Sequence, residues 1–210
     1  MSDRFLNFKK VLVLSPHPDD TEYSFSGTVL KYKGTQFDIL NMTSGGDYDR
    51  TTFNTNRIAE VKLFWEGISN VSLHFTDVSH LKSKEEDEWV SIIENMFNIS
   101  DYDAIISTNS TDSHFEHRRV STIATALCRV ARVSLLEYRS PSTLVEWIPN
   151  LFVDVASTYE EKLMRLYKFK SQLERKYFAN EQIRGFHINF QASKRGLKLV
   201  EMLRVVQLYG

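Results

Sequence analysis

The chain has 210 residues, with 26 basic and 27 acidic side chains and a formal net charge of -1. This balanced charge argues against a nucleic-acid-binding protein, which normally carries a basic excess or a basic stripe. The length suits a single hydrophobic core, so we expect residues 1–210 to form one domain.

Cysteine content and apolar runs bear on the cellular compartment. Cys128 is the single cysteine, so no disulfide can form within the chain, which favours a reducing compartment. The apolar run at 11–14 is too short for the core of a signal peptide or for a membrane span, and no later run is long enough. We therefore expect a cytoplasmic protein with no membrane span.

Short apolar runs alternate with longer amphipathic stretches, a pattern typical of a parallel sheet flanked by helices. The predicted strands are 11–14, 37–42, 71–75, 104–107 and 135–138. The predicted helices that alternate with them are 23–33, 57–67, 85–97 and 116–133. The sequence thus predicts an α/β fold with a Rossmann-like, doubly wound, mostly parallel sheet.

The alternation changes after the fifth predicted strand. Residues 140–142, Ser-Pro-Ser, indicate a loop, and 152–156 a further strand. Residues 160–175 and 194–206 have the spacing of helices. We expect this part to be a helical C-terminal extension on the same core.

Two clusters of polar residues follow strands of the predicted sheet. His17-Pro18-Asp19-Asp20 comes directly after the first strand, and the stretch 112–117, Asp-Ser-His-Phe-Glu-His, comes after the fourth. In a doubly wound sheet these two strands are typically neighbours at the topological switch point. Loops at their carboxyl ends therefore meet at one crevice.

Imidazole and carboxylate groups at such a crevice favour a zinc site, with three protein ligands and an open position for water. His17, Asp20 and His117 supply that set, and Asp19 lies beside it as a general base. His114 shares a face with His117 if the helix has begun there. Ferrous iron remains an alternative metal in the cell. The competing interpretation is that the first cluster caps a helix and the two histidines of the second lie on the surface.

The two clusters, HPDDTE and DSHFEHR, resemble the motifs of the PIG-L/LmbE-like family of zinc-dependent N-acetylglucosaminyl-type deacetylases. The likeness continues in the same order through TSGGD, RIAEVKLFWEGI, LLEYRSPST, a late KSQ and ASKRG. Three positions depart from the family pattern. Ser26 stands where a glycine is usual, Phe115 where proline is frequent and Glu116 where aspartate is common.

The resemblance implies a role for each matching residue. His17, Asp20 and His117 match the metal ligands, and Asp19 matches the general base. His114 matches the histidine that stabilises the oxyanion, and we expect it to act in its protonated form. Either Asp19 or His114 protonates the leaving amine.

Three further residues are candidates for contact with the substrate. Arg57 occupies a position where related enzymes carry a substrate-binding arginine, although an ion pair with Glu60 or with a loop carboxylate explains it equally well. Asp47 lies in a Gly-Gly-Asp loop after the second strand, where a plain turn is the alternative. Arg139 follows the fifth strand and either contacts a polar substrate or anchors the 140–142 loop.

The resemblance implies hydrolysis of an acetamide on a sugar or a sugar-containing small molecule, which releases acetate and an amine. The alternatives are a zinc amidohydrolase that acts on a non-sugar amide, such as a thiol conjugate or an antibiotic precursor, and a non-catalytic metal-binding module. The missing G-x-G-x-x-G and G-x-S-x-G motifs disfavour a nucleotide-binding protein and a serine hydrolase. The expected partner is a small N-acetylated molecule, and the oligomeric state is open, a homo-oligomer included.

Overall fold

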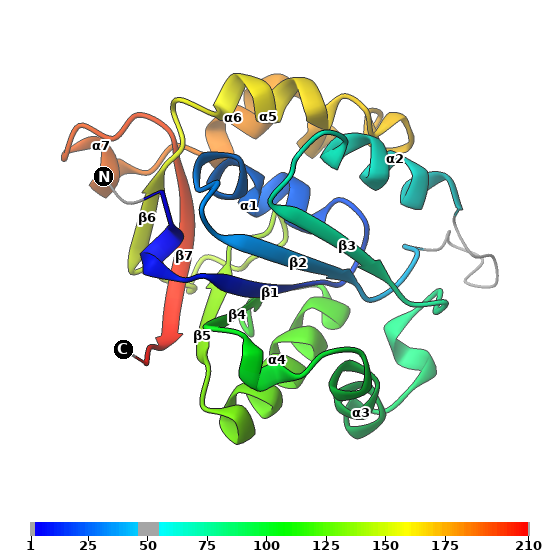
Figure 1. The fold of residues 1–210 in the computed structure, drawn as a ribbon. Helices are drawn as coiled ribbons and strands as arrows, with labels where there is room; N and C mark the ends of the chain where they lie inside the picture. Colours follow the sequence, from blue (N-terminus) through cyan, green and yellow to red (C-terminus); the bar gives the residue numbers. More distant parts are fainter. Residues whose placement is uncertain (1–2, 46–54, 210) are drawn as a thin grey trace.

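The computed structural model describes residues 3–45 and 55–209. Within these ranges one seven-stranded sheet has the order β3-β2-β1-β4-β5-β7-β6 (Figure 1). Strands β1 to β5 pair in parallel, whereas β7 is antiparallel to both β5 and β6. The strands are β1 (Lys10–Ser15), β2 (Gln36–Asn41), β3 (Val71–Phe75), β4 (Ala104–Thr108), β5 (Ser134–Tyr138), β6 (Leu151–Asp154) and β7 (Val200–Gln207). The predicted doubly wound, mostly parallel sheet is confirmed.

Helices cover both faces of the sheet (Figure 1). One layer contains α1 (Asp20–Lys31), α2 (Thr55–Trp65), α5 (Tyr159–Leu166) and α6 (Asn180–Phe186), and the other contains α3 (Glu86–Met96) and α4 (Phe115–Ala131). Successive side chains of a strand point to opposite faces, so Val11 and Val13 pack in the first layer while Leu12 and Leu14 pack in the second. A short helix, α7 (Phe190–Ser193), precedes β7. No described helix combines the length and apolar character needed to cross a membrane.

The C-terminal third differs from the prediction. The helix expected over 194–206 is wrong, because Val200–Gln207 forms β7 between β5 and β6. Gly196 has a φ of 83°, which interrupts a helix. The residues of β7 then pair with β5 on one side and β6 on the other, and this pairing stabilises the strand. The helix expected over 160–175 ends at Leu166, and β7 makes this region part of the sheet instead of a helical extension.

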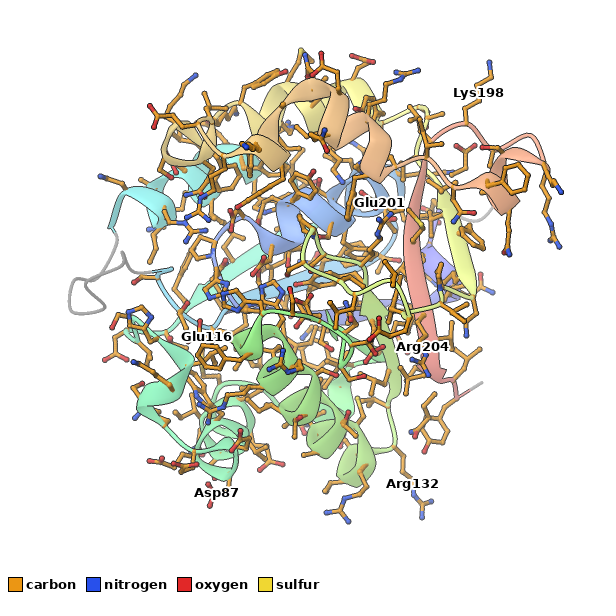
Figure 2. The ribbon with its side chains drawn as sticks, turned by 180° about the vertical axis from the view of Figure 1, so that it is seen from behind. Asp87, Glu116, Arg132, Lys198, Glu201 and Arg204 are labelled. Carbon is orange, nitrogen blue, oxygen red and sulfur yellow. The ribbon has the colours of Figure 1, made fainter. Side chains whose placement is uncertain are left out.

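A buried charged cluster joins this C-terminal third to α1. Lys162 donates to a carboxylate oxygen of Glu201 at 2.6 Å and to Nε2 of His187 at 2.9 Å, and all three side chains are inaccessible to solvent. The Glu201 carboxylate also accepts the backbone N–H groups of Gly27 and Thr28, both at 2.7 Å. Figure 2 shows Glu201 on β7 beside α1. A buried ion pair of this kind needs all its partners, since a lone buried charge is strongly destabilising.

The Lys162 cluster predicts how stability depends on pH. Burial, together with the Lys162 charge, holds the pKa of His187 well below 6.5, so the folded protein keeps this imidazole neutral. Below pH 6.5 the unfolded chain binds a proton that the folded chain does not, and the free energy of unfolding therefore decreases as the pH falls. Between pH 6 and 5 we expect the free energy of unfolding of wild type, measured in urea, to fall by about 1.2 kcal/mol more than that of His187→Gln. Parallel pH profiles of the two proteins would contradict this.

Candidate active site

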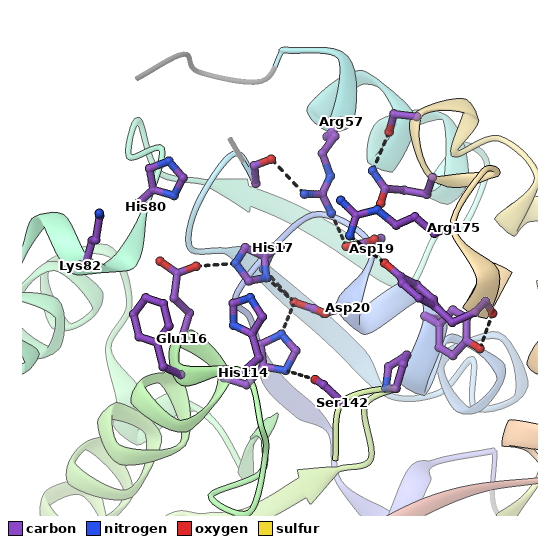
Figure 3. Close-up of a pocket in the computed structure, with 18 residues that line it drawn as sticks. His17, Asp19, Asp20, Arg57, His80, Lys82, His114, Glu116, Ser142 and Arg175 are labelled. Atoms are coloured by element: carbon purple, nitrogen blue, oxygen red, sulfur yellow. Dashed lines mark hydrogen bonds and ion pairs between the residues drawn. The ribbon is translucent and has the colours of Figure 1, made fainter. Parts of the chain in front are cut away.

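The two polar clusters meet at the carboxyl ends of β1 and β4, which are neighbours in the sheet. They line one cavity of about 500 Å³, a size typical of small-molecule sites (Figure 3). The cavity is also lined from α2, from the segment 80–82 and from the segment 171–177. Residues about a hundred positions apart thus form one site through the strand order alone.

His17, Asp20 and His117 are grouped tightly enough to hold a metal ion. Their ligand atoms lie within 4.8 Å of one another. Oδ2 of Asp20 is 3.0 Å from Nδ1 of His17 and 3.3 Å from Nε2 of His117. Burial would raise the pKa of Asp20, but the two imidazoles hold it well below its usual range. The trio therefore offers an ionised carboxylate and two imidazole nitrogens, which are donors that suit zinc.

Each of the two histidines also contacts a carboxylate on its outer side. Oε2 of Glu116 lies 2.6 Å from Nε2 of His17, and Oδ2 of Asp112 lies 3.1 Å from Nδ1 of His117. These contacts leave Nδ1 of His17 and Nε2 of His117 directed toward Asp20. Carboxylates in this position orient a ligating imidazole and raise its basicity. The pattern of the sequence pointed to the ligands but not to this role of Asp112 and Glu116.

Asp112 is itself held firmly in place. Its carboxylate accepts the backbone N–H of His114 at 2.8 Å and the hydroxyl of Ser140. Burial would raise the pKa of Asp112, but the neighbouring His117 and Ser140 lower it to about 2. Burial would in turn lower the pKa of His117, yet Asp20 and Asp112 raise it to about 10. Two carboxylates around one buried imidazole create an electrostatic environment that favours binding of a cation.

A second grouping shares His17. His17, His114 and Glu116 also present ligand atoms within 4.8 Å of one another. Here His17 offers Nε2, which is hydrogen-bonded to Glu116, and Glu116 also accepts the backbone N–H of Leu81 at 2.9 Å. Because both Glu116 oxygens already have partners and His114 is exposed, we favour as the metal site the trio with Asp20, in which Asp20 and His117 are buried.

Asp19 has an unusual backbone conformation. Its φ of 120° lies in a region that only glycine adopts readily, which stores strain of roughly 1–3 kcal/mol. Its backbone N–H donates to Oε2 of Glu22, and Trp65 donates to the other Glu22 oxygen at 2.6 Å. Burial raises the pKa of Glu22 to about 7. The first turn of α1 and α2 together hold Asp19 in this strained position beside the metal ligands.

Arg57 of α2 pairs with the Asp19 carboxylate. One guanidinium nitrogen is 2.5 Å from Oδ1 of Asp19 and 2.7 Å from the carbonyl of Pro18, and another donates to the carbonyl of Gly45. The ion pair with a loop carboxylate is therefore confirmed, and Arg57 also lines the cavity. Glu60 instead accepts from Ser171. Burial raises the pKa of Asp19, an effect that the Arg57 charge opposes.

His114 precedes α4 and lies at the cavity. Its ring stacks on that of His117 at 4.6 Å and on that of Phe115 at 5.8 Å. Partial loss of hydration and the charges of His117 and His17 lower the pKa of His114. This direction favours the neutral imidazole at pH 7, contrary to the protonated form expected from the sequence. A neutral imidazole still donates one hydrogen bond.

Of the other two candidates for substrate contact, Arg139 lies outside the cavity. Arg139 donates to the carbonyl of Phe186 and lies over its ring, so it anchors α6 and does not line the site. Asp47 lies outside the described residues. The cavity also contains side chains that the sequence pattern did not indicate. They include His80, Lys82, Tyr23, Gln172, Arg175 and Tyr177.

Residues 12–128 match the family model of the GlcNAc-PI de-N-acetylases, PIG-L, which is more than half of the chain. The chain belongs to the PIG-L family of zinc-dependent deacetylases. Among curated sequences, the uncharacterized deacetylase YaiS of Escherichia coli K12 is 27% identical over 177 residues, which cover 78% of this chain and 91% of YaiS.

Several solved structures share the fold of this chain. N,N′-diacetylchitobiose deacetylase from Pyrococcus horikoshii has a TM-score of 0.77 and 19% identity, over 98% of this chain and 86% of its own. The zinc-inhibited form of teicoplanin deacetylase Orf2 has a TM-score of 0.75 and 12% identity, over 93% and 97%. GalB of Pseudomonas putida, a 4-carboxy-2-hydroxymuconate hydratase, also reaches 0.77, at 14% identity over 96% and 98%. The fold alone therefore does not determine the reaction.

Glu116 provides a test of the metal site that does not depend on activity. Glu116→Gln removes the charge that faces Nε2 of His17, so we expect zinc affinity to fall about tenfold or more. Competition with a chromogenic chelator measures this. Glu86→Gln is the control, because Glu86 pairs with Arg119 away from the cavity and should leave zinc affinity unchanged. Wild-type affinity in Glu116→Gln would contradict the assigned role.

Proposed function

We propose that this deacetylase removes the acetyl group from an N-acetylated sugar or sugar-bearing small molecule in a zinc-dependent hydrolysis. The products are acetate and a free amine. The observation that carries the proposal is the grouping of His17, Asp20 and His117 around one point, with the buried Asp19 next to them. The family of the chain supplies the reaction class.

The residues fit the metal. Two imidazoles and one carboxylate converge in the cavity, and each imidazole has an outer carboxylate partner. A zinc ion bound there supplies a Lewis acid and a water molecule whose pKa is lowered to about 7. Ferrous iron suits the same donors, so metal analysis of the purified protein is part of any test.

In this proposal Asp19 is the general base. Its carboxylate lies within the cavity, and Arg57 holds one of its oxygens at 2.5 Å. Oδ2 is then the oxygen that accepts a proton from the attacking water. Burial raises the pKa of Asp19, which makes its carboxylate a stronger base than an exposed aspartate. The contacts of Asp19 with Arg57 and Glu22 fix the direction of that oxygen before substrate binds.

His114 stabilises the negative charge that develops on the acetamide oxygen. Its stacking on His117 orients the ring beside the metal ligands. The neutral imidazole donates its N–H to that oxygen, as in an oxyanion hole. A neutral His114 has no proton to spare for the amine. Asp19, which has taken a proton from water, is therefore the donor that we favour for the leaving group.

The sugar is proposed over a non-sugar amide for two reasons. The cavity of about 500 Å³ is larger than an acetamide needs and has polar side chains from several elements for hydroxyl groups. The related solved structures include a diacetylchitobiose deacetylase and deacetylases of teicoplanin and the A40926 pseudoaglycone. A non-sugar amide remains the second candidate because the hydrolysis itself would be the same.

Asp19→Asn tests the proposed mechanism. The amide cannot accept the proton, so we expect kcat for acetate release to fall by about 10²–10⁴-fold. The measurement uses a panel of N-acetylated sugars and sugar nucleotides and follows acetate and free amine together.

Bound zinc, measured in the same samples, distinguishes the proposed general base, Asp19, from the proposed metal ligand, Asp20. Asp19 is not among the proposed ligands, so Asp19→Asn should retain stoichiometric zinc, whereas Asp20→Asn should lose it. An Asp19→Asn protein with wild-type kcat would remove Asp19 as the base.

A further inference from the structure

Phe115 is an apolar side chain in the most polar part of the cavity. It is the first residue of α4, and its neighbours His114, Glu116 and His117 all line the same cavity. The Phe115 side chain lines the cavity too and is 43% exposed, although a ring of this size is normally buried. Nothing in the metal site requires a phenyl group at this position.

The orientation of the Phe115 ring is defined by its neighbours. It lies nearly parallel to the ring of His114, with an interplanar angle of 8° and centroids 5.8 Å apart. The ring of His114 is in turn stacked on His117 at 27°. The three rings lie one after another, from the proposed metal ligand His117 through His114 to the partly exposed Phe115. Phe115 is therefore a flat, pre-oriented apolar surface at the outer end of the residues that act on the acetamide.

A pyranose ring has the matching chemistry. Its equatorial hydroxyl groups point outward and bind polar groups, whereas its axial C–H bonds make an apolar face that packs on an aromatic ring. An acyclic acetamide has no such face. Covering the exposed part of Phe115 removes apolar surface from water, and the fixed ring loses little conformational entropy in doing so.

We propose that Phe115 is a specificity-determining residue that stacks on the sugar ring of the substrate while the acetamide lies at His114 and the metal ligands. The inference rests on the proposed function and extends it. It adds a named contact for the sugar ring, and it predicts discrimination against acyclic amides.

The experiment compares a cyclic and an acyclic acetamide, methyl N-acetylglucosaminide and N-acetylethanolamine, with zinc-loaded protein. In Phe115→Ala we expect KM for the sugar to rise roughly fivefold with kcat nearly unchanged, since only contact with the ring is lost. KM and kcat for the acyclic amide should not change. Phe115→Trp keeps an aromatic surface and should retain a KM for the sugar close to wild type.

Phe190→Ala is the matched control, because Phe190 is 72% exposed and does not line the cavity. It should leave both substrates unaffected, and thermal melting verifies that each variant folds. A fall in kcat for both substrates in Phe115→Ala would show that the ring only positions His114, and it would overturn the proposal. An unchanged KM for the sugar would overturn it as well. Absence of acetate release from every sugar by wild type would instead overturn the proposed function itself.

Discussion

The site depends on the adjacency of β1 and β4 in the sheet. Their parallel pairing places two chain segments, which are far apart in sequence, at the same edge of the sheet. Every proposed ligand lies in the loop or the first helical turn that follows one of these strands. The packing around these strands is accordingly dense, with Val13, Leu14 and Ile106 fully buried. A rigid base of this kind lets the loops hold imidazoles and carboxylates at fixed separations, which metal binding requires.

Strain at Asp19 is balanced by contacts from two other elements. Its positive φ is unfavourable for aspartate, and it persists because Glu22 binds its N–H and Arg57 binds its carboxylate. Glu22 is supported in turn by Trp65 of α2. Helix α2 thus contributes two supporting contacts to the site, through Arg57 and Trp65, although no residue of α2 is a proposed ligand. The buried Glu201 also stabilises α1, although away from the site, because it joins this helix to β7.

The sequence predicted the parts of this protein that local patterns encode. Strands β1 to β5 follow from apolar periodicity, and the positions of His17 and His117 follow from the strand ends. The strand β7 was missed because its pairing with β5 and β6 is non-local. Tyr177 was missed because it lies on a short 3-10 helix, and Arg175 because it directly precedes that helix; so short an element has no periodicity that indicates a cavity wall. The direction of the Arg139 side chain, toward Phe186, also depends on tertiary packing that no motif encodes.

Removal and restoration of the metal test the central claim most directly. The protein would be stripped with a chelator, and acetate release from the panel of N-acetylated sugars would be measured before and after zinc is added back in known amounts. The proposed site predicts that release disappears on stripping and is fully restored at one zinc per chain. Full activity of the stripped protein, or zinc-loaded protein that releases no acetate from any substrate, would contradict a zinc-dependent sugar deacetylase.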